Sequence, residues 1–177
     1  HPPPPPPAPP LAAVDALVVL GDAISSRDDP AHYHRLLHAR LEERLGAPVD
    51  CVNRAFSSAR ASDLLLQIDA LPADLPGPVA VVITAGCNDM KAAFPAIADG
   101  EDAGSRARLA HDIGAAHDAL LAPGRFGDGV VVHVFEANLF DPSDGAGDYA
   151  DRGCPFGAGL PPRPPPPPEP PRNPPHA

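Results

Sequence analysis

Short, continuous apolar runs alternate along this chain with stretches in which apolar residues recur at helical spacing. The apolar runs predict strands over residues 16–20, 79–85 and 130–135, and residues 50–53 predict a shorter strand. Runs of this length without polar alternation are typical of strands that are buried on both faces of a sheet.

Helical patterns fill the segments between these strands. After a loop at residues 21–28, we expect Asp29 to act as the N-cap of the first helix, with Pro30 as its first residue, and Gly46 to end it. The apolar face of the second helix is predicted at Ala61, Leu64, Leu65 and Ile68.

Two more helices are predicted in the second half of the chain. A short one follows residue 87 and runs to Ile97, although Pro95 would kink or interrupt it. Ser105 is the expected cap of the last helix. The apolar face of that helix is predicted at Leu109, Ile113, Ala116 and Leu120.

Strands that alternate with helices are joined by right-handed crossovers, which make the strands parallel. The sequence therefore predicts an α/β fold, a three-layer sandwich with a parallel sheet. Eight of the 28 prolines lie in residues 1–10, and eleven lie in residues 161–175. Because such runs lack apolar periodicity, we predict disordered, proline-rich tails at residues 1–10 and 161–177 and a domain at residues 11–160.

Composition excludes several classes of protein. The net charge of −10 argues against nucleic-acid binding, because no basic stripe is present to neutralise phosphates. No apolar run approaches the ~20 residues that span a bilayer. Three scattered cysteines do not form a zinc or disulfide framework, so we interpret Cys51 and Cys87 as buried free thiols, with one disulfide as the alternative. The sequence shows no signal peptide. It does not fix the compartment of the protein, and secretion stays an alternative.

Three polar blocks follow three of the predicted strands. They are Gly21-Asp22-Ala23, Asn53-Arg54-Ala55-Phe56-Ser57-Ser58-Ala59 and Gly86-Cys87-Asn88-Asp89. Ligands of parallel sheets bind at the carboxyl ends of strands, so these blocks form the candidate site. The three blocks occur in the order that is typical of the SGNH (GDSL-type) hydrolase family. The chain resembles this family over about residues 16–154.

The resemblance implies an ester or acyl hydrolase, esterase- or lipase-like, that uses no metal and no organic cofactor. In that family a Ser attacks the carbonyl, and a His oriented by an Asp three residues earlier activates the Ser. The oxyanion hole would combine the N–H groups at positions 23 and 58 with the side chain of Asn88. The supporting positions implied by the resemblance are Gly21, Asp22, Asn53, Gly86 and Asp89.

The chain departs from the family at three points. Ala23 stands at the nucleophile position and has no atom that can attack. Ser58 stands at a glycine position, where a side chain would be strained if the turn needs a positive φ. No Asp-x-x-His block follows the fourth strand, so we also expect the last strand and helix of the fold to be missing.

Other residues imitate parts of this machinery. We interpret Ser25, two positions past Ala23, as a loop hydroxyl rather than a substitute nucleophile. Asp29 and His32 have the Asp-x-x-His spacing, which helix capping explains. Asn173 and His176 share that spacing within a proline-rich segment, and we interpret this as coincidence.

Two groups of residues have some features of a metal site, but each has a simpler interpretation. His34, His38 and Glu42 lie one turn apart on the first helix, a spacing that metal ligands use. We favour an ordinary solvated face for them. The Asp- and Gly-rich residues 141–148 do not match a calcium loop and are interpreted as turns.

The sequence therefore predicts a hydrolase by descent, without metal or cofactor and with little or no activity. Its ligand would be a small-molecule, lipid or glycan ester. Two alternatives stay open, namely a non-catalytic binding or interaction module and a defective fragment without selected function.

Overall fold

The structure, a computed structural model, describes residues 13–137 of the 177-residue chain. Within these residues lies a four-stranded sheet in the order β2-β1-β3-β4, and every neighbouring pair of strands is parallel. The strands are β1 (Ala16–Gly21), β2 (Asp50–Asn53), β3 (Val79–Thr84) and β4 (Val132–Glu136). The predicted α/β fold with a parallel sheet is confirmed.

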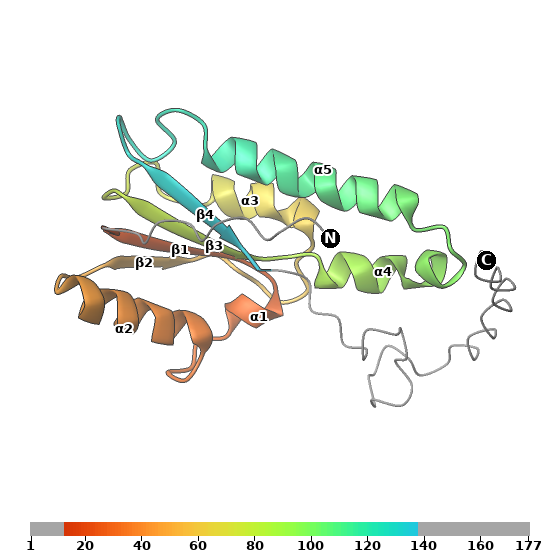
Figure 1. The fold of residues 1–177 in the computed structure, drawn as a ribbon, viewed down its shortest axis with the longest axis horizontal. Helices are drawn as coiled ribbons and strands as arrows, with labels where there is room; N and C mark the ends of the chain where they lie inside the picture. The colour runs from red at the N-terminus through yellow and green to blue at the C-terminus, as the bar shows by residue number, and fades with distance from the viewer. Residues whose placement is uncertain (1–12, 138–177) are drawn as a thin grey trace, which may run out of the picture. The chain divides into compact units, whose positions relative to one another are not determined.

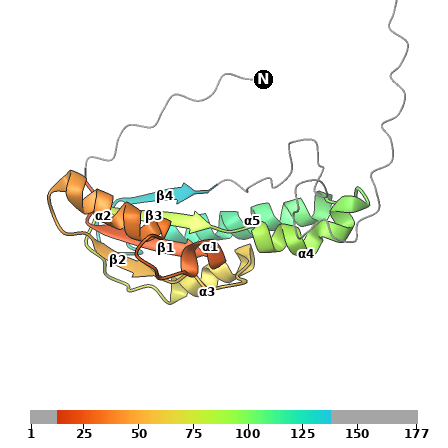
Figure 2. The same ribbon diagram turned by 90° about the horizontal axis from the view of Figure 1, so that it is seen from below.

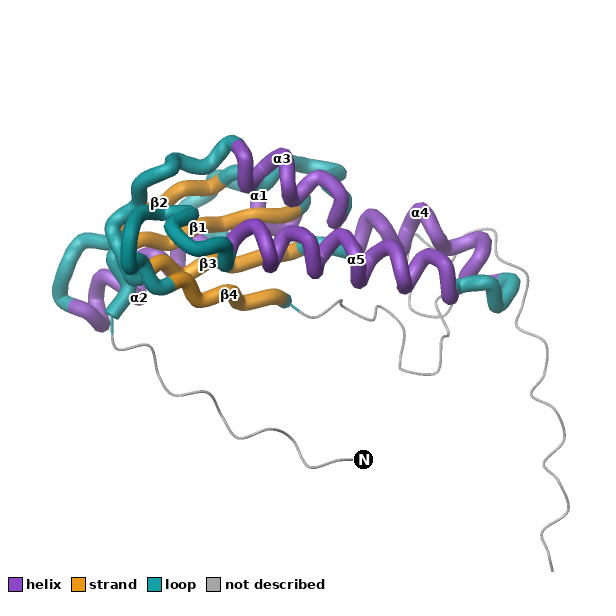
Figure 3. Tube along the Cα trace, turned by 90° about the horizontal axis from the view of Figure 1, so that it is seen from above, coloured by secondary structure: helices purple, strands orange, loops and turns teal. Residues whose placement is uncertain are grey.

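Helices lie on both faces of this sheet (Figure 1). α2 (Tyr33–Leu45) covers one face, and α3 (Leu64–Asp69) and α5 (Ala103–Leu120) cover the other, as Figure 3 shows from their side. The short helix η1 (Ala61–Asp63) leads directly into α3. α1 (Ala23–Ser26) and α4 (Cys87–Ala98) begin at the carboxyl ends of β1 and β3 (Figure 2).

β1 is central to the core because both of its faces are covered. All six of its residues are buried, as the continuous apolar run predicted. Val18 and Leu20 belong to the cluster that α3 and α5 complete, whereas Leu17 and Val19 belong to the cluster beneath α2. Burying each of these Val and Leu side chains stabilises the fold by roughly 1.5–3 kcal/mol.

The predicted start of the first helix is wrong. α2 begins at Tyr33 rather than at Pro30, and His32 occupies its N-cap position. Asp29 Oδ1 accepts a hydrogen bond from the N–H of Ala31 (3.0 Å), so its side chain closes a turn before the helix. Short Asp side chains satisfy nearby backbone groups in turns and at helix ends alike, and the sequence did not distinguish the two roles.

Three further details differ from the predictions. The expected loop after β1 contains the one-turn helix α1, which Asp22 caps. α5 begins at Ala103, before the predicted cap Ser105. α4 runs to residue 98, close to the predicted end at Ile97, but Pro95 does not interrupt it.

Burial follows the predicted helical faces with two exceptions. Ala61, Leu64 and Ile68 are buried, but Leu65 beside them is 41% exposed. Leu36, which we expected on the apolar face of the first helix, is 53% exposed. The predicted tails, the Asp-rich residues 141–148 and the expected missing strand and helix lie outside the described residues. No helix in the described part of the chain is long and apolar enough to cross a membrane.

Candidate functional site

The strand order identifies the place where a ligand would bind. From β1 the chain crosses to β2 on one side, and it then returns to β3 on the other side of β1. α2, in the connection after β1, and α5, in the connection after β3, lie on opposite faces of the sheet (Figure 1). In open α/β sheets, ligands bind at such a switch point, outside the carboxyl ends of the strands. The blocks Gly21-Asp22-Ala23 and Gly86-Cys87-Asn88-Asp89 stand there.

Gly21 makes the turn at the end of β1. Its φ is +125°, and an added Cβ would lie 2.0 Å from the carbonyl oxygen of Thr84, so only glycine fits. Buried Gln67 of α3 holds the same peptide: its Oε1 accepts from the Gly21 N–H (2.7 Å), and its Nε2 donates to the Gly21 carbonyl (2.9 Å). Gln67 was missed from the sequence, although it interrupts the apolar run from Leu64 to Ile68.

Asp22 and Ala23 have different roles in the turn. Asp22 is 2% exposed, and its carboxylate accepts from the N–H of Ile24 (3.0 Å), which caps α1. Ala23 is the first residue of α1 and is exposed. The position at which the family would place its nucleophile is therefore accessible, but its methyl group has no nucleophilic atom.

A chain of three hydroxyl groups, two of them on buried residues, continues from the Asp22 carboxylate. Thr84 Oγ1 donates to Asp22 Oδ1 (3.3 Å), so Ser25 must donate to Thr84 (2.6 Å), and Tyr33 must donate to Ser25 (2.5 Å). Burial raises the pKa of Tyr33, which keeps its hydroxyl protonated as a donor. Ser25 is fully buried, and its hydroxyl both donates and accepts a hydrogen bond, which supports the interpretation that it is a structural group rather than a substitute nucleophile.

The second block joins the first through its backbone. The N–H of Phe56 donates to the carbonyl of Gly21 (3.1 Å). Asn53 Nδ2 donates to the carbonyl of Ser25 (2.8 Å), which ties β2 to α1. Ser58 has a φ of +68°, the one positive φ of a non-glycine residue in the described part of the chain. The predicted strain at this position is therefore present, at a typical cost of about 1–2 kcal/mol.

The third block joins the second through its side chains. Asn88 Nδ2 donates to the carbonyl of Ala59 (2.8 Å), and Asp89 Oδ2 accepts from the N–H of Ala61 (2.9 Å). Gly86 has a φ of +106° and precedes α4 as its N-cap. The structure thus connects all three blocks that the sequence singled out.

Hydrogen-bond donors remain available among these residues. Within the described residues, the N–H groups of Ala23 and Ser58 have no acceptor. The Asn88 amide has two N–H bonds, and one of them is used by Ala59. These are the three donors that the resemblance assigns to an oxyanion hole.

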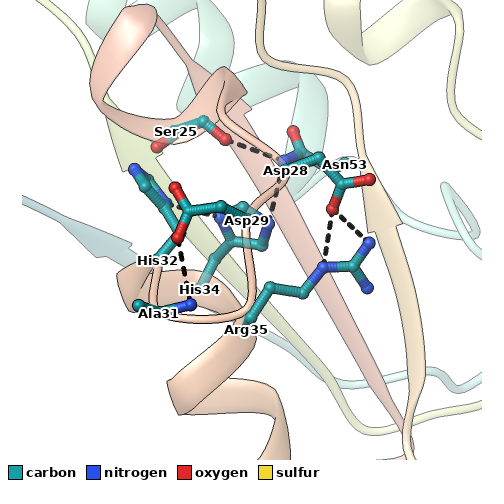
Figure 4. Close-up of polar contacts among 8 residues, drawn as sticks. All are labelled: Ser25, Asp28, Asp29, Ala31, His32, His34, Arg35 and Asn53. Atoms are coloured by element: carbon teal, nitrogen blue, oxygen red, sulfur yellow. Dashed lines mark hydrogen bonds and ion pairs between the residues drawn. The ribbon is translucent and has the colours of Figure 1, made fainter.

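The histidines of α2 do not gather into a metal site. His34 is 2% exposed, so the predicted solvated face is wrong for this residue. It lies beside His32 and Asn53 (Figure 4). His38 Nε2 bonds the carbonyl of Val49 (2.6 Å). Among residues 13–137, no three His, Cys, Asp or Glu side chains are arranged to hold a metal ion.

The structure describes two cysteines, Cys51 and Cys87, and both are half-buried. Burial raises the pKa of the Cys51 thiol, which makes it a weak nucleophile. Cys51 is a free thiol, and the third cysteine, Cys154, lies outside the described residues.

Comparison of the chain with protein-family models finds no match, and comparison with curated proteins finds no significant match.

Proposed function

We propose that this chain is an SGNH-type hydrolase by descent, whose site binds an ester but catalyses its hydrolysis weakly or not at all. The observation that carries the proposal is the set of hydrogen bonds that joins the three blocks at the switch point. The positive φ of Ser58 adds support, because the family pattern has a glycine at this position.

The proposed site can perform only part of an acyl transfer. The N–H groups of Ala23 and Ser58 and the amide of Asn88 would stabilise the oxyanion that forms when an ester carbonyl is attacked. The attack itself needs a nucleophile, and the methyl group of Ala23 supplies none. Loss of one member of a Ser-His-Asp unit reduces the rate by about 10⁴–10⁶-fold, so we expect hydrolysis near the uncatalysed rate.

A binding module is the second candidate. Two large apolar side chains next to the site, Ile24 and Phe56, are 48% and 40% exposed. Beside an accessible Ala23 they favour a retained contact with the apolar part of a small-molecule, lipid or glycan ester. This candidate predicts thermal stabilisation by such an ester without turnover.

A thiol at position 23 tests the proposal, because a thiolate attacks esters without a neighbouring base. In the Ala23→Cys variant of the full chain, p-nitrophenyl acetate should release a burst of about one equivalent of p-nitrophenolate per chain. Ala110→Cys, at an exposed position of α5, is the matched control for ordinary thiol reactivity. Adding Asn88→Ala to Ala23→Cys should slow the burst by about tenfold or more.

A further inference from the structure

Two imidazoles meet at the start of α2. The Nδ1 atoms of His32 and His34 are 2.9 Å apart, and the two ring centroids are 4.9 Å apart. His34 is 2% exposed, and His32 is half-buried. The contact lies where the loop that leaves α1 enters the helix (Figure 4).

The neighbouring groups determine which ring nitrogens carry protons. Asn53 Nδ2 lies 3.5 Å from His34 Nε2, and an amide nitrogen can only donate. The proton of neutral His34 is therefore on Nδ1, from which it donates to His32 Nδ1. The two accepting nitrogens are therefore His34 Nε2 and His32 Nδ1. Each accepts through a lone pair, which protonation of that nitrogen would remove.

The pair connects three elements. Asn53, the last residue of β2, uses its Nδ2 both toward His34 and to donate to the carbonyl of Ser25 in α1 (2.8 Å). Its Oδ1 accepts from the N–H of Ala55 (2.9 Å). A continuous chain of polar contacts therefore runs from His32 through His34 and Asn53 to α1.

We propose that the His32–His34 pair is a pH-sensitive latch. When both rings are neutral, it holds the loop at residues 27–32 and α1 against the end of β2. Protonation of either ring removes an acceptor, places two N–H groups against each other and opens the latch. The latch does not depend on the proposed function. Opening of the latch would nevertheless move the candidate site, because α1 begins at Ala23.

The charges around His34 oppose one another. Asp28 and Asp29 in the preceding loop favour the protonated ring, whereas His32 and Arg35 disfavour it. Arg35 is itself ion-paired with Asp28. From β2 the neutral amide of Asn53 faces the ring, and from α1 Ser25 adds no charge. The first turn of a helix also disfavours a cation.

Burial decides the balance, and it lowers the pKa of His34, with the nearby His32 as the next cause. Unfolded His has a pKa of about 6.5, so below this pH the unfolded chain binds more protons than the native chain. The contribution of His34 to stability is therefore complete above about pH 6.5, and it is lost as the pH falls below that value.

Thermal unfolding of the full chain tests the latch. The measurement covers pH 7.5 to 5.5. From pH 6.5 to 5.5, the folding equilibrium constant should fall by up to about tenfold, which lowers the Tm by about 3–5 °C. His34→Gln should remove most of this acid dependence, whereas His111→Gln, on the exposed surface of α5, should keep it. Equal acid dependence in all three proteins would overturn the proposal.

A measurement on the native chain covers the case in which His34→Gln does not fold. In an NMR pH titration, the backbone signals of Ser25 and Asn53 should shift together with the imidazole signal of His34, at a pH below the value of about 6.5 that is typical of an unfolded His. If the pKa of His34 is not lowered and the signals of Ser25 and Asn53 do not move as it titrates, the latch does not exist.

Discussion

Replacing Gln67 by Met removes the clamp on the Gly21 peptide while it keeps an unbranched side chain of similar length. β2 ends at Asn53, which pairs with Val19, so no strand residue reaches the N–H of Gly21 on that side. The Oε1 of Gln67 replaces that partner at 2.7 Å. In Gln67→Met the Gly21 carbonyl keeps its bond from Phe56, but the buried N–H loses its acceptor.

A buried N–H without an acceptor costs about 1–3 kcal/mol of unfolding free energy. For a domain of this size, we expect the Tm of Gln67→Met to fall by about 3–5 °C per kcal/mol. Denaturant unfolding followed by circular dichroism measures the loss, and exchange of the Gly21 amide hydrogen shows where it arises.

Leu66→Met, at a position of α3 that is 64% exposed, is the control for this comparison. It should change the unfolding free energy by less than about 0.5 kcal/mol. If Gln67→Met behaves like this control and the Gly21 amide stays protected, the clamp does not stabilise the turn.

Two substitutions test the backbone of the site. Ser58→Gly should raise the unfolding free energy by about 0.5–1 kcal/mol, because glycine relieves the φ of +68° at an exposed position; an unchanged or lower Tm would contradict the strain. Gly21→Ala should cost about 3 kcal/mol or more, since its Cβ would lie 2.0 Å from the carbonyl oxygen of Thr84. Gly46→Ala shares a positive φ but has nothing within 4 Å, so it should cost about 1 kcal/mol, and equal losses at both positions would refute the steric argument.

The sheet could be predicted from the sequence because its strands are buried. β1 and β3 lose nearly all contact with water on both faces, and continuous apolar runs record this directly. The end of α2 was equally readable, since Gly46 adopts the left-handed conformation that stops a helix. The three blocks could be placed at one edge of the sheet because parallel strands end together.

The contacts that shape the site could not be predicted in this way. Gln67 binds Gly21 across 46 positions of sequence, and Ser25 binds Thr84 across 59. No local pattern encodes such pairs. The burial of His34 was missed for the same reason, because its partner Asn53 belongs to another element. α1 was missed because one turn of helix is too short to show a period.

Acylation of the Ala23→Cys variant tests the central claim most directly, namely that position 23 is the attacking position of an acyl-transfer site. The account predicts a burst of about one equivalent that is much faster than in Ala110→Cys and is slowed about tenfold or more when Asn88→Ala is added. A thiol at position 23 that reacts no faster than the control thiol, or that is indifferent to Asn88→Ala, would contradict it.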